Sequence, residues 1–270
     1  PGVAMNRLQR YIYANSEGVC RQIEGFMDRE YSNVVSRIEQ LQDGSARIEV
    51  LGEIAGFPIY RATKSRRADL PVIMVNAGTH GDEPASIEAA LQFLEGISNR
   101  WLHRFQFEVI PCLNPYGYVH DKRENFQGID INWAYRNDTV PEIDIVKRHV
   151  IGRRFETILD LHEDWESPGY YLYEQVRGRY PAGPAMVQRV SRACPVNTTP
   201  VIEGEIAKNG VIFPNLEVAK RRKGTGVPIV LFEKGITDRL ITTETPTGLS
   251  PGIRIQANLL AIESLLEAQL

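Results

Sequence analysis

The 270-residue chain has 43 % hydrophobic and 24 % charged residues and a net charge of -3, a profile typical of a globular protein with a large core. It has no long basic block, so nucleic acid is not an expected partner, and we expect the short cluster KRRKG at 220–224 to be a solvated loop. No apolar run approaches the roughly 20 residues of a membrane span. A membrane partner is therefore not expected either.

The three cysteines indicate a reducing environment. Cys20, Cys112 and Cys194 are isolated and lack the CxxC spacing of a thiolate metal site. The N-terminus also lacks the charged-then-apolar layout of a signal peptide. We therefore expect a cytoplasmic protein without a disulfide framework.

The first part of the chain is predicted to be helical. Apolar residues recur at helical spacing over 5–26 and again over 34–41, where Gly44 is expected to end the second helix. Residues 46–64 then alternate around two glycines, which predicts a β-hairpin. We expect 1–45 to form a helical segment packed on a main domain of residues 46–270.

An alternation of strands and helices follows. The apolar run PVIMVNAG at 71–78 predicts a strand covered on both faces, and Pro84 is well placed in the first turn of the next helix. Strands are predicted at 105–114 and 156–162, with a helix over 141–152 between them. The expected fold is α/β, with a mixed, mostly parallel central sheet and helices on both faces.

The C-terminal part of the chain continues the alternation of predicted strands and helices. Strands are predicted at 170–175, 227–233 and 239–244, and helices at 183–193 and 250–269, with Ser250 as a cap. Residues 196–214 have the irregular composition of a rim loop that selects a substrate.

Polar side chains cluster where the predicted strands end. His80 and Glu83 follow one strand, residues 114–132 follow the next, and His162 ends a third. Ligands of open α/β sheets bind beyond the carboxyl ends of the strands, so these segments are expected to converge.

Two imidazoles and a carboxylate form a ligand set suited to a catalytic zinc ion. His80, Glu83 and His162 would leave one coordination position open, with Asp160 and Asp164 as carboxylates that orient the imidazoles. The alternative is that Glu83 or Asp82 caps the following helix. In that case His162 is a hydrogen-bonded loop residue.

The series GTHGDEP, NPYGYVHDKRENFQGIDIN, LDLHED and TTETP resembles the zinc carboxypeptidase superfamily, which includes the succinylglutamate desuccinylase and aspartoacylase branch. The resemblance runs from about Val72 to the C-terminus and leaves out the first 45 or so residues. It implies a phosphorylase/hydrolase-like fold and one zinc ion per chain, held by His80, Glu83 and His162.

The resemblance also implies roles at the substrate. Arg123 takes the position that polarises the scissile carbonyl, and Asn125, Asp130 and Asn132 follow in step. Carboxypeptidases usually place next an Arg that grips the terminal carboxylate, but this chain has Trp133 there. Arg136 is the candidate substitute, because a guanidinium binds a carboxylate with two hydrogen bonds; a solvent-exposed Arg136 is the alternative. Asn125, Asn132 and Arg136 are thus the expected substrate-binding residues.

A late glutamate is implied as general base. Glu244 in LITTETPTG is favoured over Glu233, which stands beside Lys234 and is more simply explained as a surface ion pair at a hairpin. We expect Glu88 to lie on a helix surface and Glu163 in a loop; the alternative is that they hold a second metal ion. Trp133 and Trp165 flank the proposed site and are candidates to line its pocket.

The expected activity is zinc-dependent hydrolysis of an amide bond, by a metallocarboxypeptidase acting on peptides. The alternative substrate is an N-acyl amino acid, which the aspartoacylase-like branch would deacylate. A binding protein that has lost catalysis is the remaining alternative.

Overall fold

The computed structural model describes residues 29–41, 46–215 and 226–269. The predicted helix over 5–26, the residue Gly44 and the KRRKG cluster lie outside the described residues. Within the described ranges, no helix has the length and apolar character needed to cross a membrane.

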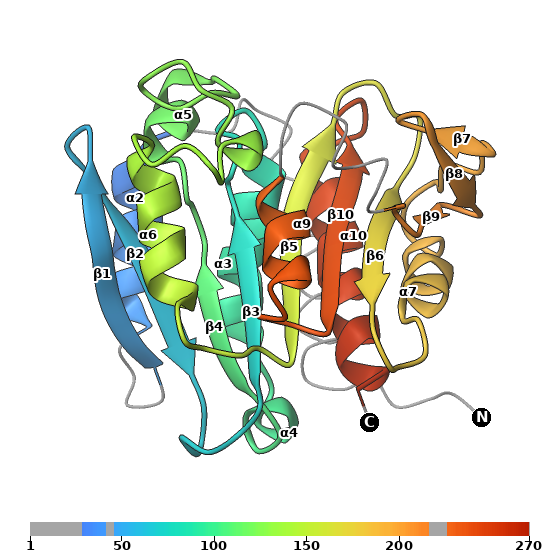
Figure 1. Ribbon diagram of the computed structural model, residues 1–270, viewed down its shortest axis with the longest axis horizontal. Helices are drawn as coiled ribbons and strands as arrows, with labels where there is room; N and C mark the ends of the chain where they lie inside the picture. The colour runs from blue at the N-terminus through green and yellow to red at the C-terminus, as the bar shows by residue number, and fades with distance from the viewer. Residues whose placement is uncertain (1–28, 42–45, 216–225, 270) are drawn as a thin grey trace.

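A ten-stranded mixed sheet forms the centre of the described part (Figure 1). The strand order is β1-β2-β4-β3-β5-β10-β6-β9-β8-β7. The strands are β1 (Ala46–Ile54), β2 (Phe57–Lys64), β3 (Val72–Ala77), β4 (Gln106–Ile110), β5 (Thr157–Asp164), β6 (Tyr171–Val176), β7 (Val201–Ile202), β8 (Glu205–Lys208), β9 (Val211–Ile212) and β10 (Arg239–Pro246).

The parallel part of the sheet is its middle. β4, β3, β5 and β10 are parallel neighbours, and β6 and β9 also pair in parallel. The remaining pairs, β1–β2, β2–β4, β10–β6, β9–β8 and β8–β7, are antiparallel. Short turns that reverse the chain join β1 to β2 and β7 to β8 to β9. The predicted mixed α/β sheet is confirmed, but it is not mostly parallel: the parallel pairs are those of the four central strands and β6–β9, and the other five pairs of the described strands are antiparallel.

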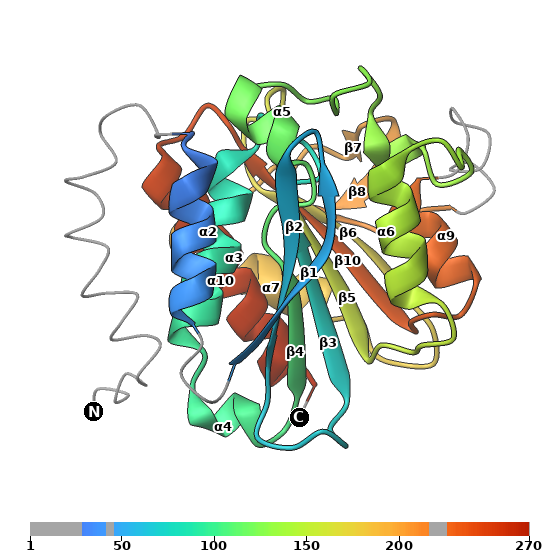
Figure 2. The ribbon, with the colours of Figure 1, turned by 90° about the vertical axis from the view of Figure 1, so that its left-hand side faces the viewer.

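Helices cover both faces of the sheet, as predicted (Figures 1 and 2). One face carries α3 (Pro84–Gly96), α7 (Gly183–Val190) and α10 (Pro251–Glu267), and its core continues into β3 and β5. The other face carries α6 (Pro141–Val150) and α9 (Val227–Glu233). The helix α2 (Tyr31–Gln40) packs Tyr31, Val34 and Ile38 against α3. Short helices occur at α4 (Asn99–Leu102), α5 (Pro115–His120) and η1 (Ile131–Trp133).

The predicted strand at 227–233 is wrong, because these residues form the helix α9. Pro228 has no amide hydrogen for a strand ladder, but it fits the first turn of a helix. Val230, Leu231 and Phe232 are buried in the core on this face of the sheet. An apolar run of seven residues does not distinguish a short buried helix from a strand.

Candidate active site

The loop after β3 is fixed by two glycines. Gly78 has a φ of 63°, a backbone conformation that favours glycine. Gly81 lies so close to α5 that a Cβ atom there would stand 1.9 Å from the carbonyl carbon of Gly117. Arg29 also donates to the Gly81 carbonyl at 2.7 Å. This tight turn presents His80 and Glu83 at the carboxyl end of the sheet.

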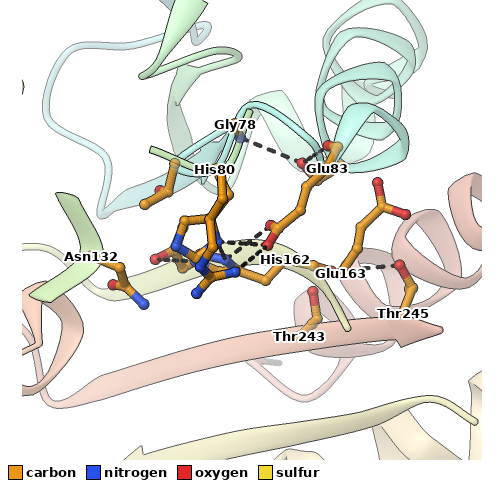
Figure 3. A network of polar contacts seen from close by, with 12 residues as sticks. Gly78, His80, Glu83, Asn132, His162, Glu163, Thr243 and Thr245 are labelled. Carbon is orange, nitrogen blue, oxygen red and sulfur yellow. Dashed lines mark hydrogen bonds and ion pairs between the residues drawn. The ribbon is translucent and has the colours of Figure 1, made fainter. Parts of the chain in front are cut away.

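The three predicted metal ligands come together (Figure 3). His80, Glu83 and His162 are each no more than 2 % exposed, and one ligand atom from each lies within 4.8 Å of the others. His80 Nδ1 is 2.6 Å from Glu83 Oε1, and His162 Nδ1 is 3.0 Å from Glu83 Oε2. The two Nδ1 atoms are 3.1 Å apart. Both imidazoles therefore turn the same nitrogen toward one carboxylate.

The opposite nitrogen of each imidazole faces another carboxylate. His162 Nε2 is 3.1 Å from Asp160 Oδ2, as expected for an orienting partner. His80 Nε2 is 3.2 Å from Asp130 Oδ1, a contact that the sequence analysis missed. Asp164, also expected in this role, instead accepts from the Tyr171 hydroxyl at 2.8 Å. With Nε2 of each ring near a carboxylate, Nδ1 of both rings is available as a ligand atom.

The donor set fits a divalent cation. Glu83 Oε2 is buried without a well-formed hydrogen bond in the described part of the chain. Burial opposes its ionisation, but the charges of His80 and His162 hold the pKa of Glu83 below its usual range. Burial likewise opposes protonation of His162, but Asp160 and Glu83 raise its pKa well above the usual value. The carboxylates thus favour a positive charge between the two imidazoles. Two imidazoles with a carboxylate are typical zinc ligands.

The Glu83 side chain does not cap the following helix α3. This residue occupies the N-cap of α3, but its side chain makes no capping hydrogen bond. Glu163 serves that end of the helix instead, because its Oε1 accepts from the Ala85 amide at 2.7 Å. Glu163 is buried in β5 and paired with Arg254 of α10, so the expected loop role is wrong. A helix N-terminus favours such an anion.

Arg123 lies at the edge of the group of candidate metal ligands His80, Glu83 and His162 (the metal cluster). Its Nε donates to Asp130 Oδ2 at 3.0 Å, and its Nη1 is 3.6 Å from Glu83 Oε1. The side chain is 40 % exposed and lines the pocket beside the cluster. Asp130 therefore positions both His80 and Arg123.

Of the three predicted substrate-binding residues, Asn125, Asn132 and Arg136, one lines the pocket. Asn132 lines the pocket, and its Oδ1 is buried without a partner among the described residues. Asn125 is buried, donates to Glu142 at 2.9 Å and holds its own loop, outside the pocket lining. Arg136 is exposed and does not line the pocket. The structure thus brings Asn132 to the site but not Asn125 or Arg136.

The tryptophan in the position of the family arginine is part of the pocket wall. Trp133 packs near the N-terminus of α9, where a Cβ atom on the N-cap residue Gly226 would stand 3.3 Å from the Trp133 ring. Trp165 is exposed and lines the same pocket. Both tryptophans therefore lie where the sequence analysis expected them.

Of the two candidate bases, only Glu244 reaches the pocket. It lies in β10 opposite His162 of β5 in the parallel register. Burial raises the pKa of Glu244 to about 8, with a further contribution from the charges of Glu83 and Asp164. Glu233 lies at the end of α9 and does not line the pocket.

The pocket measures about 340 Å³ and extends from the metal cluster over β10 and β6. Tyr171, Tyr173 and Gln175 of β6 and Glu205 of β8 line it, and the sequence analysis assigned none of them to a site. The alternation in YYLYEQ contained a signal, because every second residue of a strand faces the same side. The predicted rim loop at 196–214 contains β7, β8 and β9 and contributes Glu203, Glu205 and Pro214 to the lining.

Sequence comparison supports the assignment for part of the chain. A family model described as zinc carboxypeptidase matches residues 52–153, which contain His80, Glu83 and Arg123. No curated protein matches the chain.

Solved structures share the fold over most of the chain. A candidate metallopeptidase from Shewanella denitrificans has a TM-score of 0.77 at 22 % identity, covering 90 % of this chain and 92 % of its own. The carboxypeptidase A of Helicoverpa armigera has a TM-score of 0.68 at 16 % identity, covering 96 % and 78 %. A metallo-carboxypeptidase from Burkholderia cenocepacia gives 0.68 at 15 %, covering 92 % and 70 %. The family match over residues 52–153 and the shared fold confirm the resemblance to the zinc carboxypeptidase superfamily.

Proposed function

We propose that the chain is a zinc-dependent hydrolase that cleaves an amide bond, acting on peptides as a metallocarboxypeptidase. The observation that supports this most directly is the convergence of His80, Glu83 and His162 at one end of a pocket that Glu244 and Arg123 also line. His80 Nδ1, His162 Nδ1 and the Glu83 carboxylate would hold the metal. When bound, a zinc ion supplies a Lewis acid and activates water near neutral pH.

Glu244 is the proposed general base. Its carboxylate faces the pocket beside the metal cluster, level with His162 of β5, where it can reach a water molecule held there. It takes a proton from the attacking water at a carboxylate oxygen. It then returns that proton to the nitrogen of the leaving amine, which departs neutral.

Arg123 is the proposed stabiliser of the carbonyl oxygen. Negative charge develops on this oxygen as water attacks, and a guanidinium held in place stabilises that charge more than it stabilises the neutral amide. The hydrogen bond from Nε to Asp130 at 3.0 Å fixes the side chain before substrate arrives. Asn132 Oδ1, which has no hydrogen-bond partner among the described residues, is placed to accept a hydrogen bond from the substrate.

One observation favours the deacylase alternative. Trp133 replaces the expected arginine, and Arg136 lies outside the pocket lining, so Arg123 is the one Lys or Arg among the described lining residues. A terminal carboxylate would then be bound differently from the family pattern. Peptides and N-acyl amino acids must therefore be compared directly.

Hydrolysis of matched substrates tests the proposal. N-blocked dipeptides and N-acetyl amino acids with the same C-terminal residues are incubated with zinc-loaded protein, and the released amino acid is measured. We expect dipeptide hydrolysis that a chelator abolishes and added zinc restores. Faster cleavage of the N-acetyl amino acids would favour the deacylase, and no cleavage of either class would overturn the proposed hydrolase.

A further inference from the structure

The pocket continues well beyond the metal cluster along two strands. Glu244, Thr242 and Leu240 of β10 face it, and their register partners on β6 are Tyr171, Tyr173 and Gln175. Gln175 pairs with Leu240, which is four residues before Glu244 in β10. Gln175 therefore lies roughly 13 Å from Glu244 along the strand direction. A substrate cleaved beside Glu244 would need a long side chain to reach Gln175.

Gln175 is a buried amide without a hydrogen-bond partner among the described residues. The residue is 6 % exposed, and neither Oε1 nor Nε2 makes a hydrogen bond within the described part of the chain. Its neighbour Glu174 points to the opposite face, where it accepts from the amides of Ala182 and Gly183. A buried polar group without a hydrogen bond carries a desolvation cost that a bound ligand can remove.

Glu205 lies in the same row of the sheet. Tyr173 is the register partner of Ile212 on β9, and Ile212 is the partner of Ala207 on β8. The paired residues of β9 end at Ile212; continued two residues beyond it, the same register would bring Gln175 level with Pro214 and Glu205, and all three line the pocket. Glu205 is 9 % exposed and forms no ion pair with another described residue. An amide and a carboxylate therefore flank this end of the pocket.

The charge of the lining favours a cation. The pocket has one Lys or Arg among its described lining residues, Arg123. Its acidic lining residues apart from the proposed ligand Glu83 are Glu163, Asp164, Glu166, Glu203, Glu205 and Glu244. Arg123 stands at the metal end, next to Asp130. The far end thus has acceptors and negative charge without a cation from the described lining.

We propose that this far end, formed by Gln175 and Glu205, binds the ammonium or guanidinium group of a long substrate side chain. Gln175 Oε1 and the Glu205 carboxylate accept its hydrogen bonds, while the rings of Tyr171 and Tyr173 line the path of its apolar stem. The inference rests on the proposed function, because the side chain must belong to the substrate that Glu244 and the metal cluster process. For a carboxypeptidase, the preferred peptides end in a lysine-like or arginine-like residue.

The first test compares side chains with the same stem. Values of kcat/KM are measured for N-blocked dipeptides that end in lysine, arginine or the uncharged norleucine. We expect the basic substrates to be preferred, and we expect Gln175→Leu or Glu205→Gln to lower that preference about 10- to 100-fold, the range expected for a hydrogen bond to a charged group. The control Glu53→Gln removes an exposed charge from β1 and should keep the preference.

The second test does not require hydrolysis. Binding of free L-lysine, L-arginine and L-norleucine to zinc-loaded protein is measured by calorimetry, for the wild type and the same three variants. Tighter binding of the basic amino acids that Glu205→Gln abolishes would support the site, even if no amide were cleaved and the proposed function failed. Equal binding of lysine and norleucine by the wild type, together with dipeptide hydrolysis that shows no basic preference, would overturn the inference and leave the hydrolase in place.

Discussion

Two buried clusters in the described part of the chain combine glutamate with histidine, and they differ in the source of positive charge. In one, Glu83 lies between the Nδ1 atoms of His80 and His162, and Arg123 approaches it only to 3.6 Å. In the other, Glu108 of β4 lies 3.2 Å from His149 Nε2 and 2.6 Å from Arg153 Nη2.

The second cluster, formed by Glu108, His149, Arg61 and Arg153 (the arginine cluster), supplies its own positive charge. Arg61 Nη1 also approaches Glu108, at 3.4 Å, and lies 3.0 Å from His149 Nδ1. The guanidinium groups of Arg61 and Arg153 thus neutralise Glu108 and also contact the His149 ring. Glu83 is instead contacted by two imidazoles, and a cation bound between them would replace their protons. The same residue types therefore form a structural ion pair in one place and a candidate metal site in the other.

The largest effect that would sharpen this comparison is expected at Glu244. Glu244→Gln removes the proposed base and should lower kcat by about 10²- to 10⁴-fold with metal content unchanged. Glu233→Gln is the matched control, because Glu233 lies outside the pocket lining and should keep its activity. The opposite result, with Glu233→Gln inactive and Glu244→Gln active, would contradict the assignment.

Arg123→Ala should produce the next largest loss of activity. Removing a fixed donor to the developing charge costs about 3 to 4 kcal/mol of barrier, seen as a lower kcat at the same zinc content. Arg136→Ala serves as the control, because its side chain is exposed outside the pocket. A raised KM in Arg136→Ala for substrates with a free carboxylate would instead restore Arg136 as a substrate-binding residue.

The arginine cluster should show its effect in the pH dependence of stability. Burial opposes ionisation of Glu108, but hydrogen bonds from His149 and Arg153 hold its pKa at about 2. Because the folded-state pKa is depressed, its stabilisation is present above the unfolded value near 4.5 and is lost as the pH falls toward 2. We expect urea unfolding to show a loss of about 3 kcal/mol between pH 6 and pH 2 that is absent in Glu108→Gln. Equal pH profiles for the variant and the wild type would contradict this role.

The smallest expected effect is a gain in stability at Gln175. Gln175→Leu keeps a similar volume and removes two buried atoms without hydrogen-bond partners, so it should raise the free energy of unfolding by roughly 1 kcal/mol. Urea denaturation measures the change. A clear loss of stability would show that the Gln175 amide supports the fold and is not kept for a ligand.

The metal cluster could be predicted from sequence because its parts follow adjacent parallel strands. His80 follows β3 and His162 lies near the end of β5, and these strands are neighbours, so local motifs sufficed to bring them together. Asp130 was quoted in the motif but not assigned to His80, because its contact depends on how the loop before η1 folds.

Other features depend on long-range arrangement. Gln175 and Glu205 meet only through the registers of β6, β9 and β8, which no local pattern specifies. Arg136 was proposed from its spacing to Asn132, but spacing does not determine where a loop turns its side chains. The helix α9 was missed because Pro228 and a seven-residue apolar run carry no clear periodicity.

The most direct test of the central claim is the metal content of the purified protein, measured by elemental analysis after zinc is supplied. We expect about one zinc ion per chain in the wild type and in the control His103→Ala, whose histidine is exposed, and loss of that zinc in His162→Ala. No bound zinc in the wild type, or equal zinc in His162→Ala, would contradict the assignment of His80, Glu83 and His162 as the metal site.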